Sequence, residues 1–205
     1  MREKQIIFAA KVLSVVFTPF YLPLLGLVSL LTLTYLSLLP VMYKLFLLFT
    51  FWLFTIFLPT MLIRLYRHYQ GWSRFELGSR ERRVIPYVIS IVSYLLCYYI
   101  MAAAHVPHFL GTILIASLVI QVVCAMVNLF IKISTHTAAI GGVTGALLAF
   151  SLIFGFNPVW WLCLVLIIAG LLGTCRMVLR QHSLHQVVTG YLVGVVCAFV
   201  AVLLF

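Results

Sequence analysis

The sequence contains no aspartate, and Glu3, Glu76 and Glu81 are the only acidic residues among its 205. Membrane prenyltransferases and alcohol phosphotransferases hold Mg²⁺ with clustered aspartates, because a hard cation prefers several carboxylate oxygens. A chain without such a cluster is not expected to work in that way. Hydrolysis by a pair of carboxylates is equally unexpected.

Cysteines at metal-ligand or disulfide spacing are also lacking. The five cysteines lie within or at the edge of apolar stretches, and none belongs to a CxxC pair. A zinc site or a disulfide framework is therefore not indicated. We expect no metal and no cofactor.

Charge of either sign is scarce, since 65% of the residues are hydrophobic and only 8% are charged. No soluble fold of this size hides so much hydrocarbon from water. A bilayer core of about 30 Å needs roughly 20 apolar residues as helix. We therefore predict an all-α, polytopic integral membrane bundle with six to seven transmembrane helices. The predicted spans run over about 14–39, 42–63, 86–104, 109–130, 136–156, 158–175 and 185–205.

The first of these spans has an alternative. Pro19 and Pro23 disfavour a straight helix, so residues 6–17 could form a separate interfacial helix beside six spans. The basic, apolar start of the chain lacks a small-residue cleavage site and is interpreted as a retained segment. The longest polar stretch, Arg64 to Arg83, is only a connector. Residues 1–205 are thus expected to form a single transmembrane domain.

The net charge of +10 comes from thirteen lysines and arginines, which fall almost entirely on one predicted face. These are Arg2, Lys4 and Lys11, then Arg64, Arg67, Arg74, Arg80, Arg82 and Arg83, then Lys132, and finally Arg176 and Arg180. Lys44 is alone on the opposite face. Because cytoplasmic loops carry the Lys and Arg excess, this face is predicted to be cytoplasmic. The membrane of this multi-pass protein is expected to be a bacterial inner membrane, with the membrane of a eukaryotic organelle as the open alternative. The basic residues lie between apolar runs, so we expect lipid headgroups as partners and no nucleic acid.

Polar residues gather at the start of the fifth predicted span. Lys132, Ser134, Thr135 and His136 would surround a helix N-terminus, where free N–H groups and the helix dipole favour an anion. The glycines that follow, at 141, 142 and 145, would allow a neighbouring helix to approach closely. This segment is therefore a candidate anion site.

A second polar group joins the last two predicted spans. Arg176 and His182 are six residues apart. His182 and Gln186 are expected to form an i, i+4 pair on one face of the last helix. A guanidinium, an ammonium group and two imidazoles would converge at one membrane face. This combination suits a phosphate monoester or a diphosphate.

At these residues the chain resembles the type 2 phosphatidic acid phosphatase superfamily of membrane lipid phosphatases. The family's second motif, Pro-Ser-Gly-His, is matched at Ser134 and His136, while Ile133 replaces Pro and Thr135 replaces Gly. Its third motif has an Arg, a His six residues on, an Asp four further and then a Gly. This chain has Arg176, His182, Gln186 and Gly190 in those places.

The first motif of the family has no clear match. Arg80, Arg82 and Arg83, which precede Pro86, could replace it, or Lys132 could supply its charge. The same three arginines could equally be an ordinary positive-inside anchor. The family-like core would span about 80–205, with extra N-terminal spans at about 6–63.

The resemblance implies a metal-independent phosphatase, a phosphoric monoester or diphosphate hydrolase of lipid metabolism. His182 would attack phosphorus and form a phosphohistidine, and His136 would protonate the leaving group. Ser134 and Arg176 would hold phosphoryl oxygens, together with Lys132 and Thr135. The substrate would be a phosphatidate, a phosphatidylglycerol phosphate, a polyprenyl diphosphate or a lipid A phosphate. Oligomeric state is left open.

Gln186 departs from the family, because an amide can orient the nucleophile's ring but supplies no negative charge. The chain is therefore a slower phosphatase, an enzyme whose orienting group lies elsewhere, such as Glu81, or a relative that binds or carries phosphorylated lipids without cleaving them. A helix-capping or interfacial role for His136 is also open, as is a snorkelling role for Lys132. A small transporter is a further alternative, although the middles of the spans are apolar.

Overall fold

The computed structural model describes residues 2–33, 35–71 and 84–205, and these ranges contain helices and no strand. Six helical runs are long and apolar enough to cross a membrane. They are Val41–Tyr69, α5 Val84–Ala103, α6 His108–Phe130, α7 Thr135–Phe154, α8 Val159–Val178 and α9 Leu184–Leu204. Large apolar side chains point outward along them; Trp160, for example, is 85% exposed. The all-α, polytopic membrane bundle predicted from composition is confirmed.

The first membrane run is one continuous but irregular helix. It consists of α3 Val41–Phe51, a π-helical segment η2 Trp52–Phe57 and α4 Leu58–Tyr69. Pro59 cannot donate a backbone hydrogen bond and its ring crowds the carbonyl four residues earlier, which widens the turn. Within that turn, the Thr55 hydroxyl donates to the Phe51 carbonyl at 2.7 Å.

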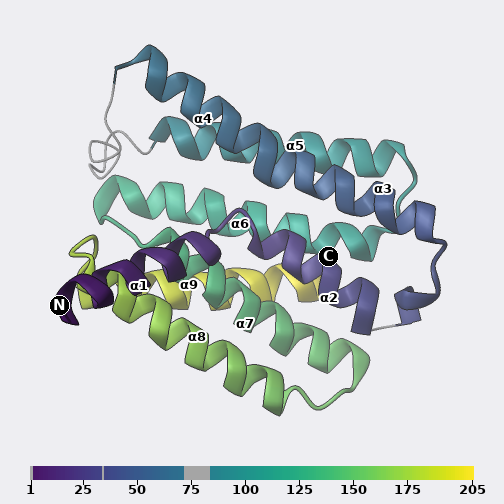
Figure 1. The fold of residues 1–205 in the computed structure, drawn as a ribbon. Coiled ribbons are helices and arrows are strands. Elements are labelled where there is room, and N and C mark those ends of the chain that lie inside the picture. The colour runs from purple at the N-terminus through teal and green to yellow at the C-terminus, as the bar shows by residue number, and fades with distance from the viewer. Residues whose placement is uncertain (1, 34, 72–83) are drawn as a thin grey trace.

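The predicted span at 14–39 is wrong as a single helix. Helix α1 covers Arg2–Val16, and after a break around Pro19 the chain continues as α2 Leu22–Leu33 and a short 3-10 turn, η1 Tyr35–Leu38. The separate N-terminal helix that the prolines left open is the arrangement found. Figure 1 shows α1 and α2 following one another along the bundle, from the end that holds the N-terminus to the opposite end.

The two termini therefore lie at opposite ends of the bundle (Figure 1). At the far end, the His108 ring approaches the C-terminal residue, with Nδ1 3.2 Å from the Phe205 carbonyl oxygen. Within the described residues, the chain runs along the bundle six times as a continuous helical run and once as the interrupted pair α1–α2.

Helices α7 and α9 are parallel and pack with their backbones in contact. A Cβ on Gly194 would lie 1.9 Å from the Ala138 carbonyl oxygen, and one on Gly145 would lie 2.2 Å from the Val195 carbonyl oxygen. The residue numbers of the contacts increase in the same direction along both helices, which shows that the pair is parallel. Two GxxxG spacings, 141–145 and 190–194, form this contact. The close approach expected from the α7 glycines is confirmed, and it brings both N-termini to the same end.

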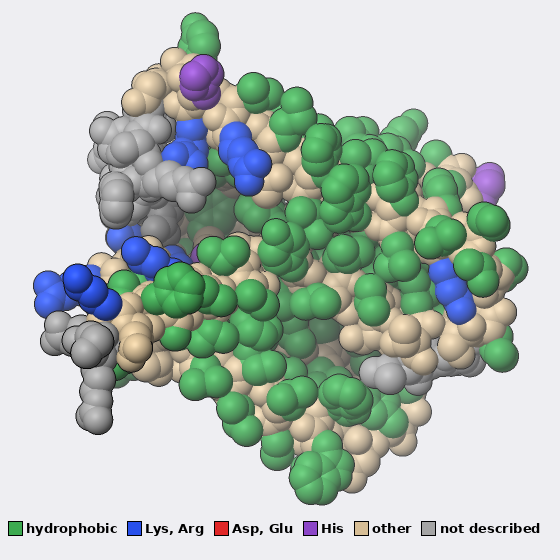
Figure 2. Space-filling model, viewed as in Figure 1, with side chains coloured by type: hydrophobic (Ala, Val, Ile, Leu, Met, Phe, Trp, Pro, Cys, Tyr) green, Lys and Arg blue, Asp and Glu red, His purple; other side chains and the backbone are tan. Residues whose placement is uncertain are grey.

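Lysine and arginine side chains gather at that same end. Figure 2 shows them around the end where α1 begins and α4 finishes, beside atoms that are not described. Lys44 lies in the first turn of α3, and its ammonium group donates to the Ser37 carbonyl of η1. One end of the bundle thus holds nearly all of the basic residues in the described ranges.

Replacing Gly194 with alanine tests the α7–α9 contact. We expect Gly194→Ala to lower the free energy of unfolding by about 1–3 kcal/mol or more, because the added methyl group has no room against backbone. SDS titration of the protein in mixed micelles measures this quantity.

Gly170→Ala in α8 is the matched control, since a Cβ at Gly170 meets nothing within 4 Å. Its effect should stay within about 0.5 kcal/mol. Equal effects of the two substitutions would contradict the packing described for α7 and α9.

Candidate functional site

Ser134 begins α7 and is fully buried. Its hydroxyl oxygen accepts from the Thr137 backbone N–H at 3.5 Å, and its carbonyl accepts from the Thr137 hydroxyl at 3.0 Å. Lys132 and Thr135, on either side of Ser134, are half-buried. The structure therefore places the first predicted cluster at a helix N-terminus, as expected.

Arg176 lies in the last turn of α8 and is only 9% exposed. The helix ends directly afterwards in a Schellman motif, in which Arg180 has a left-handed φ of 52°. The Arg180 N–H donates to the Met177 carbonyl at 2.8 Å, and the Gln181 N–H donates to the Arg176 carbonyl at 3.1 Å. This tight turn leaves a short link, so Arg176 and His182 both lie at the α8–α9 junction.

His182 is 7% exposed and stands just before α9, not on it. The expectation of a helical i, i+4 pair with Gln186 is wrong in this detail, because Ser183 is the N-cap and the helix begins at Leu184. The two residues meet nevertheless, since the Gln186 side chain folds back over the start of the helix. His182 Nδ1 is 3.1 Å from Gln186 Oε1.

The hydrogen bonds of Gln186 fix the tautomer of His182. The Ser183 backbone N–H donates to Gln186 Oε1 at 3.3 Å, so the amide must present its oxygen on this side. An amide oxygen only accepts, and the His182 Nδ1 beside it must therefore carry a proton. In the neutral ring this leaves the lone pair on Nε2, the nitrogen that a nucleophile needs.

The main chain of Gln186 links the polar residues at the start of α7 to those at the α8–α9 junction. The Ser134 N–H donates to the Gln186 carbonyl at 3.3 Å. One turn further along α9, a Cβ on Gly190 would lie 2.6 Å from both the Ser134 carbonyl oxygen and the Thr137 hydroxyl oxygen. The starts of α7 and α9 are thus in direct contact, and Gln186 touches His182 with its side chain and Ser134 with its backbone.

His136 contacts the N-terminal helix. Its Nε2 lies 3.2 Å from the carbonyl oxygen of Ser14, in the last turn of α1. Because a carbonyl only accepts, Nε2 carries a proton. This is the helix-capping contact that the sequence left open.

Sequence reasoning missed Ser14 and the part that α1 plays at this site. The contact joins positions 122 residues apart, and Ser14 is one of several small polar residues in apolar helices. No pattern within α1 itself indicates the contact.

The electrostatic field at this end favours an anion. The N-termini of two helices of 20 and 21 residues lie side by side there, together with Lys132, Arg176 and Arg180. Arg80, Arg82 and Arg83, predicted to bind phosphate, and Glu81 lie outside the described residues. Within the described ranges, no three His, Cys, Asp or Glu side chains are grouped as metal ligands.

No protein-family model, curated protein or solved structure matches this chain. The resemblance to the type 2 phosphatidic acid phosphatase superfamily therefore rests on the residues themselves and their spacing. The residues concerned are Ser134, His136, Arg176, His182 and Gly190.

Proposed function

We propose that this membrane protein hydrolyses the phosphomonoester or diphosphate of a lipid through a phosphohistidine on His182. The observation that carries the proposal is the buried His182 ring, whose Nδ1 proton is held by Gln186. Arg176 and the start of α7 lie at the same end of the bundle, and both favour phosphate oxygens. The type 2 phosphatidic acid phosphatase superfamily is the class of enzyme that this arrangement resembles.

In the first step, the His182 Nε2 lone pair forms a bond to phosphorus while the bond from phosphorus to the leaving oxygen breaks. The guanidinium of Arg176 and the N–H groups at the start of α7 stabilise the charge that develops on the phosphoryl oxygens. His136 acts as an imidazolium: its Nε2–H keeps donating a hydrogen bond to the Ser14 carbonyl, and its Nδ1 proton passes to the leaving oxygen. Capping of α1 and proton donation are compatible, because an imidazolium has two N–H groups.

In the second step, water attacks the phosphohistidine. His136, now neutral, accepts a proton from the water, the N–P bond breaks, and inorganic phosphate leaves. His182 recovers its Nε2 lone pair and the cycle closes. A diphosphate would release a lipid monophosphate in the first step instead of an alcohol.

A lipid is the proposed substrate because the site lies at the end of an apolar bundle and not on a polar domain. A hydrocarbon tail can remain in the bilayer while the headgroup meets the basic end. Phosphatidates, phosphatidylglycerol phosphates, polyprenyl diphosphates and lipid A phosphates all fit this description. From the excess of Lys and Arg at this end, we propose that the site faces the cytoplasm, in a bacterial inner membrane. A reporter that is active only outside the cytoplasm should then be active when it is fused after Phe205.

A binder or carrier of phosphorylated lipids is the second candidate. It is favoured by one observation, the neutral Gln186 in contact with His182, where a carboxylate would stabilise the charged ring. Such a protein would hold the phosphate at the same residues and would release none.

The test of the proposal is phosphate release from these four lipid classes by purified protein in EDTA. We expect turnover by the wild type and a loss of at least about 10³-fold in His182→Ala, which lacks the nucleophile. His136→Ala should lose about 10²–10⁴-fold, as expected for a missing general acid.

His185→Ala is the matched control, because His185 is exposed on the first turn of the same helix. It should keep wild-type turnover. If His182→Ala retained turnover, the nucleophile assignment would be wrong; lipid phosphate binding without release would favour the carrier.

Gln186→Glu tests the amide directly. Glutamate keeps the side-chain length and the oxygen that faces His182, and it adds the negative charge that stabilises an imidazolium. We expect kcat to rise at least about tenfold, a fraction of the roughly 10⁴-fold that a carboxylate contributes in a serine protease triad.

His185→Glu places the same charge on the same turn without the contact to His182, and should leave kcat nearly unchanged. An unchanged or lower kcat in folded Gln186→Glu would contradict the expectation that a negative charge beside His182 speeds the reaction.

A further inference from the structure

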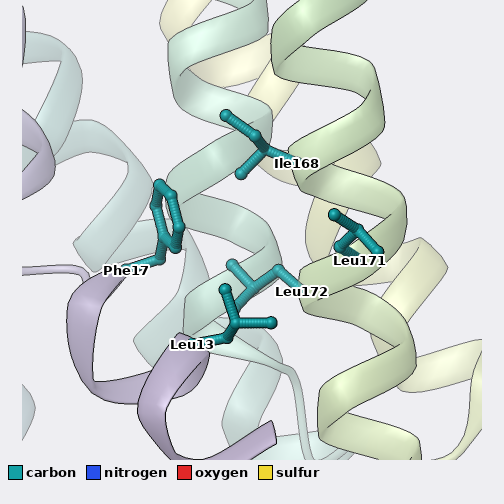
Figure 3. Close-up of a pocket in the computed structure, with 5 residues that line it drawn as sticks. All are labelled: Leu13, Phe17, Ile168, Leu171 and Leu172. Atoms are coloured by element: carbon teal, nitrogen blue, oxygen red, sulfur yellow. The ribbon is translucent and has the colours of Figure 1, made fainter. Parts of the chain in front are cut away.

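An apolar groove lies between α1 and α8, at the edge of the bundle (Figure 3). Its lining consists of Leu13 and Phe17 from α1 and Ile168, Leu171 and Leu172 from α8. Leu172 is buried and forms its floor, whereas Leu171 is 53% exposed at its rim. Because Leu171 is exposed, the groove is shallow and open toward the hydrocarbon on one side.

Both walls of the groove lead to the candidate site. On α8, Leu172 and Arg176 are four residues apart, so they share one face of the helix. On α1, Leu13 and Phe17 lie on either side of Ser14, whose carbonyl oxygen is 3.2 Å from His136 Nε2. The groove therefore begins about one helical turn from two residues of the site.

We propose that this groove holds the part of one hydrocarbon chain nearest the headgroup, in a phosphorylated lipid whose phosphate lies at the candidate site. The inference rests on the proposed function for the position of the phosphate. It adds that α1 is a wall of the substrate site, although the family-like motifs all lie after residue 80.

Charge selects the occupant. The polar end of the groove adjoins Arg176, His136 and the start of α7, so a lipid with an anionic phosphate is held at one end by cations while its chain follows the groove. A neutral lipid lacks the anchoring group. The hydrocarbon chain gains little free energy by moving from the bilayer into an equally apolar groove. The phosphate therefore provides the attraction, and the groove determines where the hydrocarbon chain lies.

The groove is shallow and open on one side, so a hydrocarbon chain would lie along it and would not be enclosed by it. Only the part of the chain next to the headgroup would contact Leu171 and Leu172, while the remainder stays among the bilayer lipids. The half-buried Phe17 also packs on the cluster formed by Ile140 and Leu172, which keeps α1 in place against α7 and α8.

The test uses a phosphatidate that carries a photoactivatable diazirine in its acyl chain close to the ester. After irradiation in liposomes, we expect cross-linked peptides to map to residues 13–17 and 168–172. The matching diacylglycerol probe, which lacks the phosphate, should label these peptides at least about fivefold less, because about 1 kcal/mol of phosphate anchoring already corresponds to that ratio. Equal labelling by the two probes, or label spread over all lipid-facing helices, would overturn the proposal.

Two pairs of variants test the groove itself. Leu13→Trp fills it from α1, and Val12→Trp, at the neighbouring exposed position, is the control. Leu171→Trp fills it from α8, and Leu164→Trp, two turns away on the same exposed face, is the control. Both groove variants should lose at least about fivefold in phosphatidate labelling, and both controls should match the wild type. Unchanged labelling in folded Leu171→Trp would overturn the proposal even if Leu13→Trp failed to fold.

Labelling requires no turnover, so the two proposals fail separately. Phosphate-dependent labelling of the groove in a protein that releases no phosphate would support the groove and refute the phosphatase. Turnover with no preference for the groove peptides would support the phosphatase and refute the groove.

Discussion

The backbone contact between the parallel helices α7 and α9 is the constraint on which the candidate site depends. Glycines at 141, 145, 190 and 194 remove the side chains that would separate the helices, and carbonyl oxygens of one helix take their place against the other. In a bilayer, where burial of apolar surface drives little association, such close packing is a main source of helix pairing. Because the two helices are parallel, this contact also brings their N-termini together.

That placement concentrates positive potential at one end of the bundle, and the described part of the chain has no group of three His, Cys, Asp or Glu side chains that could hold a metal ion. The free N–H groups of two helices, the guanidinium of Arg176 and the ammonium group of Lys132 lie at one end of an apolar bundle. Gln186 connects these parts, since its carbonyl accepts from Ser134 and its side chain holds His182. The absence of aspartate from the sequence is thus reflected in the site itself, where a neutral amide orients a buried imidazole.

Much of this arrangement was predictable from local sequence. The scarcity of charge predicted the membrane bundle, Ser134 before an apolar run predicted a helix start, and the α7 glycines predicted close packing. Pro19 indicated that the first apolar stretch need not be one helix. Local patterns fail where distant segments meet. The contact of His136 with Ser14 depends on how α1 packs against the bundle. The position of His182 ahead of α9 depends on which residue caps that helix. Residue spacing alone determines neither.

If His182 carries the phosphoryl group during turnover, as we propose, the phosphohistidine can be trapped chemically. Protein turning over a ³²P-labelled lipid phosphate would be quenched in alkali, in which phosphohistidine survives, and then digested and mapped. We expect an acid-labile label on the peptide that contains His182, which unlabelled substrate removes and which is absent in His182→Ala. Turnover without any label on His182, or with the label on another residue, would contradict it.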